Sequence, residues 1–400
     1  MTQRPVGETS PDAPPAREIG IVRQRYTPYG GAERFVADAL AALRDRGVEL
    51  TLYTRSWPAR ADAFRPEICN PFYVGSVWRD WSFARSVRGR WSAHRPDLVQ
   101  SHERIAGCDI FRAGDGVHRI WLEERRRGMN LLRRLGLALN PYHRYMRYAE
   151  TRMFADPALK AVICNSRLVL EQIHGRFGMP EAKLHLIYNA VDSKRFSPAL
   201  RAHRDTMRSI HGIPHDAVVF LLVGSGYDRK GVRPALAALS SLPNNAWLLV
   251  AGKDKRFGRY ASLARRLRVA DRTTFLGPVD DVAPLYGAAD AFVLPTLYDP
   301  LPNACLEAMA SGLPVITSTQ CGAAELVDAH AAGFVTDALD LPALSAAMSA
   351  LLEPATRWAM GARARTAVLP LTIEAMTARL LALYESLLSD LSASRGYRGR

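Results

Sequence analysis

Short apolar strands alternate with helical runs along most of this chain, and this alternation restricts the fold more than any other feature. Runs rich in β-branched and apolar residues that alternate with helices are typical of parallel sheets covered on both faces. The first set of expected strands is EIGIVRQ (18–24), VELTLYT (48–54), DLVQSH (97–102), KAVICNS (160–166) and KLHLIYNAV (183–191). The pattern therefore predicts the α/β class.

The strand-and-helix pattern starts again at Ala217, after a polar connector. The second set of expected strands is AVVFLLVGS, NAWLLVAG, TTFLGPV, AFVLPT, PVITS and GFVTD. Four hundred residues also exceed what one hydrophobic core usually serves. We predict two doubly wound, Rossmann-like domains that face a central cleft, at 18–195 and 205–370, with a hinge near 193–216. A periodic helix at 371–390 is expected to pack back toward the N-terminal domain.

The rest of the composition is typical of a cytoplasmic protein. Residues 1–17 are polar and Pro-rich without the apolar segment of a secretory signal, and we expect them to be a disordered lead. The five cysteines form no C-x-x-C pair and show no metal-type spacing with histidine, which favours a reducing compartment and no metal site. No apolar run reaches the roughly 18 residues expected of a membrane-spanning helix.

Positive charge is concentrated in one part of the first domain. The net charge is +14, and 79–147 contains fifteen arginines and seven acids. The densest part, 123–148, alternates Arg pairs with Leu, Met and Tyr. Such a segment can bind nucleic acid, an anionic membrane surface or an anionic substrate, or it can be a solvated helix face.

A basic pair follows the first strand of the second domain. In GYDRKGV, Arg229 and Lys230 come just before a helix that we expect to begin near Gly231. Side-chain cations beside the free N–H groups of a helix start form an anion site, because both favour negative charge. The residues alone leave two interpretations open, a phosphate site and an exposed basic turn.

Two acids flank a predicted helix start in TLYDPLPNACLEAMASGLPVITS, residues 296–318. We expect Leu301, Pro302 and Asn303 to form the first helical turn, whose N–H groups favour a diphosphate. Glu307, one turn into the helix, is then placed to accept hydrogen bonds from a ribose, and Asp299 from sugar hydroxyls. A solvated Glu307 and a turn-forming Asp299 are the alternatives.

The first domain offers two glycine-containing loops. Gly30 and Gly31 in PYGGAER lie between a strand and a helix, where a ligand can approach the backbone closely. The full G-x-G-x-x-G pattern is missing, which disfavours a nicotinamide site. Asp115 sits between two glycines, either as a turn former or as an exposed carboxylate. We find no D-x-D pair for a nucleotide-bound metal, no G-x-S-x-G and no Walker loop.

Together, GGAER, GSGYDRKGV and YDPLPNACLEAMASGLPVITS resemble the retaining glycosyltransferases of family 4, which have the GT-B fold. The third segment is similar to that family's E-x7-E signature, and the resemblance extends from about Ile19 to Leu388. TPYGGAERFV, VELTLYTRSW, GCDIFRAGD, YHRYMRYAETRMF and GSGYDRKGVRPALAALSSLP are more similar to the lipopolysaccharide core glucosyltransferases that add the first glucose to inner-core heptose.

The resemblance implies a role for each candidate residue. The pair Gly30–Gly31 matches a loop that faces the donor diphosphate and the acceptor, and Arg229–Lys230 matches the basic pair that binds the phosphates and stabilises the departing UDP. Glu307 matches the ribose-binding acid, and Asp115 an active-site Asp near the anomeric carbon. Asp299 matches the acid that contacts the transferred sugar. It is one methylene shorter than the usual Glu and is followed by Pro300 where many relatives have Gly or Ala.

The resemblance also implies a reaction, a partner and a location. It implies a retaining, metal-independent transferase that moves a hexose, glucose from UDP-glucose, onto a heptose of the lipopolysaccharide inner core, with no cofactor besides the UDP-sugar co-substrate. The acceptor is then a lipid-linked core oligosaccharide, and the enzyme is peripheral on the cytoplasmic face of the inner membrane and binds no nucleic acid. The alternatives are another UDP-sugar donor, another envelope glycan acceptor, and a GT-B scaffold that binds nucleotide sugars without activity.

Overall fold

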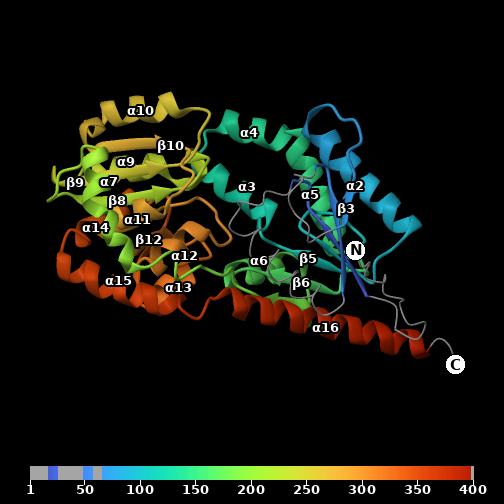
Figure 1. Cartoon of the computed structure of the whole chain (residues 1–400). Coiled ribbons are helices and arrows are strands. Elements are labelled where there is room, and N and C mark those ends of the chain that lie inside the picture. The colour runs from blue at the N-terminus through green and yellow to red at the C-terminus, as the bar shows by residue number, and fades with distance from the viewer. Residues whose placement is uncertain (1–16, 26–47, 57–64, 398–400) are drawn as a thin grey trace, which may run out of the picture.

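The computed structural model describes residues 17–25, 48–56 and 65–397, and it consists of two lobes, each built on a parallel sheet (Figure 1). In the N-terminal lobe seven strands pair in the order β3-β2-β1-β4-β5-β6-β7. The strands are β1 (Glu18–Val22), β2 (Glu49–Thr54), β3 (Arg65–Ile68), β4 (Leu98–Ser101), β5 (Ile110–Arg112), β6 (Ala161–Cys164) and β7 (Leu184–Leu186). The order reverses between β1 and β4, so ligands are expected at the carboxyl ends of these two strands.

The C-terminal lobe has the same architecture, with strand order β10-β9-β8-β11-β12-β13. Its strands are β8 (Val218–Val223), β9 (Ala246–Ala251), β10 (Thr273–Gly277), β11 (Ala291–Leu294), β12 (Val315–Ser318) and β13 (Gly333–Thr336). Its helices are α7 (Arg204–Ile210), α8 (Tyr227–Lys230), α9 (Val232–Leu239), α10 (Phe257–Arg266), α11 (Ala283–Ala288), α12 (Asn303–Ala310), α13 (Ala324–Ala329), α14 (Leu341–Ala350) and α15 (Pro354–Val368). Here the order reverses between β8 and β11. The predicted pair of doubly wound α/β domains is confirmed.

Successive residues of the N-terminal strands face two different cores, as the pleat of a strand requires. Val99, Phe111 and Val162 pack in one core with side chains of α2 (Gly75–Ala93), α5 (Pro141–Phe154) and α6 (Arg167–Phe177). Leu98, Ile110 and Ile163, their neighbours along the chain, pack in the other. The described residues of this lobe also form α3 (His118–Arg127) and α4 (Leu131–Leu139).

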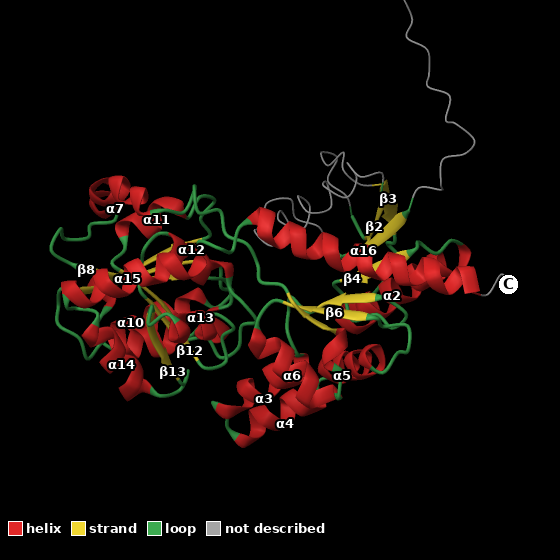
Figure 2. Cartoon of the chain, turned by 90° about the horizontal axis from the view of Figure 1, so that it is seen from below, coloured by secondary structure: helices red, strands yellow, loops and turns green. Residues whose placement is uncertain are grey.

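The last helix of the chain, α16 (Ile373–Tyr397), lies along the N-terminal sheet rather than in the lobe that precedes it (Figures 1 and 2). Its residues Met376, Leu380 and Tyr384 are buried in the same core as Leu98 and Ile163. The Tyr384 hydroxyl also donates a hydrogen bond to Gln100 Oε1 on β4. The N-terminal domain is therefore completed by the C-terminal end of the chain.

Among the described residues, one stretch, Pro354–Leu391, is long and apolar enough to cross a membrane by length and composition alone, which corrects the expectation that no such run exists. It spans two helices, α15 and α16, and the turn between them. Ala364 and Val368 of α15 are in the core of the C-terminal lobe, while Leu380 of α16 is in that of the N-terminal lobe. The apolar residues of this stretch therefore serve the two cores.

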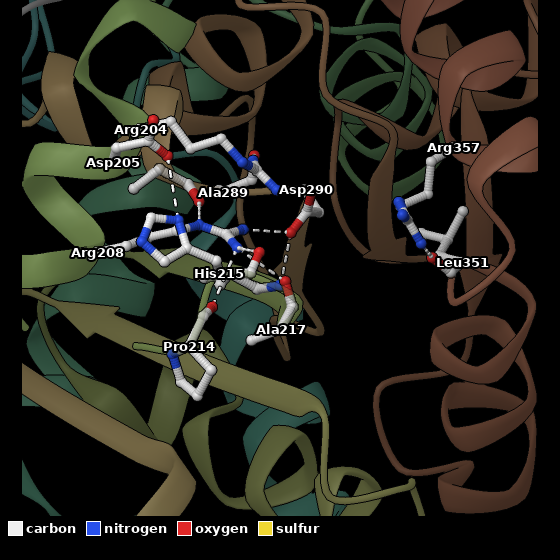
Figure 3. A network of polar contacts seen from close by, with 12 residues as sticks. Arg204, Asp205, Arg208, Pro214, His215, Ala217, Ala289, Asp290, Leu351 and Arg357 are labelled. Carbon is white, nitrogen blue, oxygen red and sulfur yellow. Dashed lines mark hydrogen bonds and ion pairs between the residues drawn. The ribbon is translucent and has the colours of Figure 1, made fainter. Parts of the chain in front are cut away.

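A buried arginine fixes the connector between the domains to the C-terminal lobe. The Arg208 side chain on α7 is fully buried, and its Nη2 contacts Asp290 Oδ2 at 2.6 Å (Figure 3). Arg208 Nη1 donates to the carbonyl oxygens of His215 and Ala217, both at 2.9 Å. Asp290 also accepts from the N–H of Val219 on β8, so the network joins the connector to the sheet. Removal of Asp290 would leave the buried Arg208 guanidinium without a counter-charge, which typically costs about 3–5 kcal/mol.

Candidate active site

Two loops at the carboxyl ends of β8 and β11 meet where the strand order of the C-terminal sheet reverses. After β8, Gly224 has φ +156°, and a Cβ there would lie 2.8 Å from Lys230 Cε. The Lys230 side chain therefore lies across a residue that must be glycine. Gly231 has φ +79°, and a Cβ there would lie 2.0 Å from the Pro295 carbonyl oxygen of the other loop. The two loops are thus in close backbone contact.

The basic pair belongs to a short helix of its own. Arg229 and Lys230 are the last residues of α8, and α9 begins at Val232 after the left-handed Gly231. The predicted helix start near Gly231 is therefore confirmed, with α8 as an additional helical turn before it. Leu297 N donates to the Arg229 carbonyl oxygen at 2.8 Å, which ties α8 to the loop after β11.

Asp299 is the ion-pair partner of both cations. Its Oδ2 lies 2.8 Å from Arg229 Nη1 and 2.6 Å from Lys230 Nζ. The side chains of Lys230 and Asp299 are almost buried, whereas that of Arg229 is 39% exposed. One carboxylate thus holds two cations, so the cluster contains more basic than acidic side chains. This carboxylate contacts the two cations, whereas the sequence prediction has it contact a sugar.

The helix after this loop begins later than predicted. The helix α12 starts at Asn303, with Pro302 as its N-cap, so Leu301 and Pro302 precede the helix instead of forming its first turn. Asn189, on the segment that leaves the N-terminal sheet, holds this start through hydrogen bonds from Nδ2 to Asn303 Oδ1 (2.9 Å) and to the Leu301 carbonyl oxygen (3.3 Å). The start of α12 is therefore held by the N-terminal domain.

Glu307 lies one turn into α12 and is partly buried. Its Oε2 accepts a hydrogen bond from the Tyr286 hydroxyl at 2.7 Å. Burial raises the pKa of Glu307 above its usual range, and the bond from Tyr286 partly offsets this increase. The carboxylate is therefore oriented by a buried tyrosine of α11, which the sequence patterns did not reveal.

Asp115 is exposed in a tight turn after β5, and this turn packs against the Asp299 loop. The next residue, Gly116, has φ +63°, and a Cβ there would lie 2.2 Å from Tyr298 Oη and 2.8 Å from Pro300 Cγ. Val117 N donates to the Tyr298 hydroxyl at 2.8 Å. Residues on both sides of Asp299 thus contact the residues that follow Asp115. The structure brings these two acids to the same interface between the domains.

The last of the predicted site residues, Gly30 and Gly31, lie outside the residues that the structure describes. The strand that precedes them, β1, ends beside β4. After β1, Gln24 N donates to Glu103 Oε1 at 3.0 Å, so the loops after these two strands are joined at the reversal point of the N-terminal sheet.

A cavity of about 630 Å³ separates the two domains next to the cation pair. From the C-terminal domain it is lined by Asp228 and Gly231, which flank Arg229 and Lys230, and from the N-terminal domain by residues of α3 and α4 such as Arg125. The predicted cleft between facing domains is therefore present.

Comparisons with known proteins agree with this architecture. Residues 29–195 match the family described as "Glycosyltransferase Family 4", and residues 203–367 match "Glycosyl transferases group 1". The chain belongs to the family 4 glycosyltransferases. Its two facing sheets are the GT-B fold.

Two relatives act in lipopolysaccharide synthesis by their names. The lipopolysaccharide glucosyltransferase WaaG of Escherichia coli is 25% identical over 87% of this chain and 93% of its own length. The lipopolysaccharide core biosynthesis glycosyltransferase LpsE of Rhizobium meliloti is 28% identical over 73% of this chain and 77% of its own length.

Solved structures have the same fold. The crystal structure of WaaG aligns with a TM-score of 0.77 at 23% identity, covering 90% of this chain and 98% of that one. HepE of Anabaena, solved in complex with UDP-glucose, aligns with a TM-score of 0.69 at 20% identity, covering 92% and 99%.

In this glycosyltransferase a buried ion pair supports the Asp115 turn. Arg104 Nε lies 3.1 Å from Glu150 Oε1, and both side chains are buried. Arg104 Nη2 donates to the Gly116 carbonyl oxygen at 2.8 Å, and Glu150 Oε1 accepts from His118 N, the first residue of α3, at 2.8 Å. Sequence patterns did not identify this pair, because its members lie 46 residues apart and meet only through the packing of α5.

Proposed function

We propose that this glycosyltransferase transfers glucose from UDP-glucose to a heptose of the lipopolysaccharide inner core, with retention of the anomeric configuration. The observation that carries the proposal is the cluster of Arg229, Lys230 and Asp299 beside the Asp115 turn, at the reversal point of the C-terminal sheet. The names of WaaG and LpsE support the lipopolysaccharide core as the acceptor. The UDP-glucose complex of HepE supports the donor.

The chemistry needs stabilisation of a leaving diphosphate. As the bond from the anomeric carbon to UDP breaks, negative charge grows on the phosphate oxygens, and preorganised cations stabilise it most effectively where water is excluded. In our proposal the donor diphosphate takes the place of the Asp299 carboxylate on Arg229 and Lys230. Asp299 is then released toward the sugar, and Glu307 accepts hydrogen bonds from the ribose.

The acceptor side is assigned to the N-terminal domain. Asp115 is exposed at the interface, where it can orient the acceptor hydroxyl near the anomeric carbon. In a retaining front-face reaction, the leaving phosphate takes the proton of that hydroxyl. Two protein cations supply the charge that a metal would otherwise provide, so we propose that the reaction needs no metal ion.

We also propose that the enzyme works at the cytoplasmic face of the inner membrane, held there by α4. Leu131, Leu132, Leu135 and Leu139 on this helix are 56–80% exposed. Arg133 and Arg134 lie among them. Exposed leucines beside arginines are typical of helices that lie in the interface of an anionic membrane.

A nucleotide-sugar panel tests the donor assignment. UDP-, GDP- and ADP-sugars are added separately to the full chain, and thermal unfolding is followed. A ligand at one hundred times its dissociation constant adds about 2.7 kcal/mol to the free energy of unfolding. We expect this stabilisation with UDP-glucose. Stabilisation by a GDP- or ADP-sugar and none by UDP-glucose would contradict the assignment.

A further inference from the structure

A groove runs between α2 and α5 on the N-terminal domain, away from the cation pair. Its volume is about 750 Å³, and its floor is the connection from β4 to β5, from Arg104 to Gly107. The side chains that give it its chemistry are Trp81, Arg85 and Arg88 from α2, and Tyr145, Tyr148 and Arg152 from α5.

The groove is strongly basic. Of the residues that the structure describes, five arginines and one acid, Asp156, line it. Arg95 pairs with Asp109, and Arg104 with Glu150. Arg85, Arg88 and Arg152 have no carboxylate partner among the described residues. These three guanidinium groups are therefore available to an anion from outside, and guanidinium is suited to planar, charge-assisted recognition of phosphate.

Aromatic rings stand beside the free cations. The Arg85 guanidinium lies 5.9 Å from the centre of the Trp81 ring, and Arg152 Nη1 donates to the Tyr148 hydroxyl at 3.2 Å. Rings of Trp and Tyr combine a large apolar face with a polar edge. The groove thus offers faces on which sugar rings can pack next to groups that bind phosphate.

One residue, Arg104, links the groove to the Asp115 turn. Arg104 lines the groove and donates through Nη2 to the Gly116 carbonyl oxygen, one residue after Asp115. A cavity of about 20 Å³, room for about one water molecule, shares Arg104 and Tyr145 with the groove and is also lined by Gln24 and Glu103, which follow β1 and β4. Part of an acceptor bound in the groove would therefore lie close to the Asp115 turn, with Arg104 between them.

We propose that this groove binds a phosphate-bearing part of the acceptor saccharide, with Arg85, Arg88 and Arg152 as the phosphate ligands. The proposal rests on the proposed function, since it assigns the acceptor subsite of the same enzyme. The recessed shape and the wall shared with the Asp115 turn favour the saccharide over a lipid headgroup. The exposed leucines assigned to the membrane lie on α4, a helix that does not line the groove.

Gly89 makes the proposal testable without disturbing the fold. It lies in the middle of α2, lines the groove, and a Cβ added there meets no atom within 4 Å. Any other non-proline residue also favours a helix more than glycine does. Gly89→Glu therefore places a carboxylate among the arginines in a folded protein, and Gly89→Ala is the matched control.

The assay measures transfer from UDP-glucose to soluble, delipidated core oligosaccharide, with and without its phosphate groups. With the phosphorylated acceptor we expect Gly89→Glu to raise KM about tenfold, because the new carboxylate repels phosphate and pairs with its ligands, while Gly89→Ala keeps the wild-type KM. The KM for UDP-glucose should stay unchanged. On the dephosphorylated acceptor the two variants should be equal. Equal KM values on the phosphorylated acceptor would overturn the proposal, and so would an effect seen only with lipid-bearing acceptor.

A binding measurement separates this proposal from the proposed function. Phosphorylated core oligosaccharide is titrated into the full chain by calorimetry, with UDP present to fill the donor site. The triple variant Arg85→Ala, Arg88→Ala, Arg152→Ala should weaken binding at least tenfold. The control triple variant Arg265→Ala, Arg266→Ala, Arg379→Ala, which removes the same charge from other exposed sites, should not. If the wild type binds the oligosaccharide but transfers no glucose to it, the proposed function is refuted while the assignment of the groove is supported. Equal binding by both triple variants would refute the groove.

Discussion

At the scale of single residues, the Asp299 carboxylate joins the two cations of the candidate site. It accepts from Arg229 and Lys230 through the same oxygen, Oδ2. Two cations that would repel each other are thereby held a short distance apart, ready for a ligand with more negative charge. Asp299 stands where the signature usually has Glu, so its side chain is one methylene shorter. Its Oδ2 contacts both cations in this structure.

Lys230→Ala tests the role of the cations. We expect kcat to fall by about 10²–10³, the range found when one preorganised donor to a developing oxyanion is removed. Lys255→Ala, which removes an exposed lysine from the loop after β9, is the control and should keep wild-type turnover. Steady-state UDP release measures both variants, and circular dichroism verifies that they are folded. A Lys230→Ala enzyme with near-normal kcat would remove Lys230 from the mechanism.

The Asp115 turn supplies a matched pair of glycines. Gly116→Ala places a Cβ 2.2 Å from Tyr298 Oη at a positive φ, whereas a Cβ at Gly114 meets nothing within 4 Å. The left-handed conformation alone costs a non-glycine residue about 1–2 kcal/mol. We expect Gly116→Ala to lower both the melting temperature and kcat, and Gly114→Ala to change neither substantially. Similar melting temperatures and kcat values of the two variants would show that the close approach of Gly116 to Tyr298 does not determine the geometry of the site.

A partly buried histidine beside this turn links stability to pH. Burial, aided by the nearby Arg104, lowers the pKa of His118 to about 3. The unfolded chain therefore binds a proton at this residue below pH 6.5 that the folded chain does not, and stability decreases as the pH falls from about 6.5 toward 3. Between pH 6.5 and 5 this costs about 1.5 kcal/mol. The free energy of unfolding is measured in urea at both pH values. For His118→Gln its decrease from pH 6.5 to pH 5 should be smaller than that of the wild type by about 1.5 kcal/mol. His330→Gln, at an exposed site, should show the wild-type decrease.

At the scale of secondary-structure elements, α4 carries the membrane prediction. Leu132→Ser with Leu135→Ser removes two exposed leucines, each worth about 1.5–3 kcal/mol on full burial. We expect the double variant to bind anionic vesicles at least tenfold more weakly in a flotation assay, with unchanged UDP binding. Ile210→Ser removes an exposed apolar residue from α7 and serves as the control. Wild-type flotation by the α4 variant would place the membrane contact elsewhere.

The sequence predicted elements well where the apolar runs are long. All eleven expected strands are present, but β3 and β5 were missed, because RPEI and IFR are short and carry charged residues. The start of α12 was placed two residues early, because Leu301 and Pro302 are compatible with a first turn and only the tertiary bonds from Asn189 show where the helix begins.

The proximity of the candidate residues was predictable where they follow strands in order along the chain. Arg229, Lys230 and Asp299 lie together because parallel strands bring their carboxyl ends to one edge. Tyr298, Tyr286 and the Arg104–Glu150 pair were not, because their roles depend on contacts between distant segments that leave no periodic signal. The one hint of these contacts in the sequence was Tyr298, which directly precedes Asp299, the first acid of the signature.

At the scale of the whole molecule, two crossings join the domains, and they lie side by side. Val191 N, on the segment that leaves the N-terminal domain, donates to the Leu371 carbonyl oxygen between α15 and α16 at 2.9 Å. The C-terminal end of the chain then completes the N-terminal core through α16. The hydrogen bond between the two crossings and the packing of α16 on the N-terminal core therefore hold the two domains together. The cation cluster and the Asp115 turn approach each other from opposite sides of the interface.

The most direct test of the central claim is the product of one reaction. The full chain is incubated with UDP-glucose, heptose-terminated core acceptor and EDTA, and the product is analysed by NMR. We predict one UDP released per glucose transferred, a new α-glucosidic bond to heptose, and an unchanged rate in EDTA. A β-linked product, transfer abolished by EDTA, or UDP-glucose binding without any transfer would contradict the account.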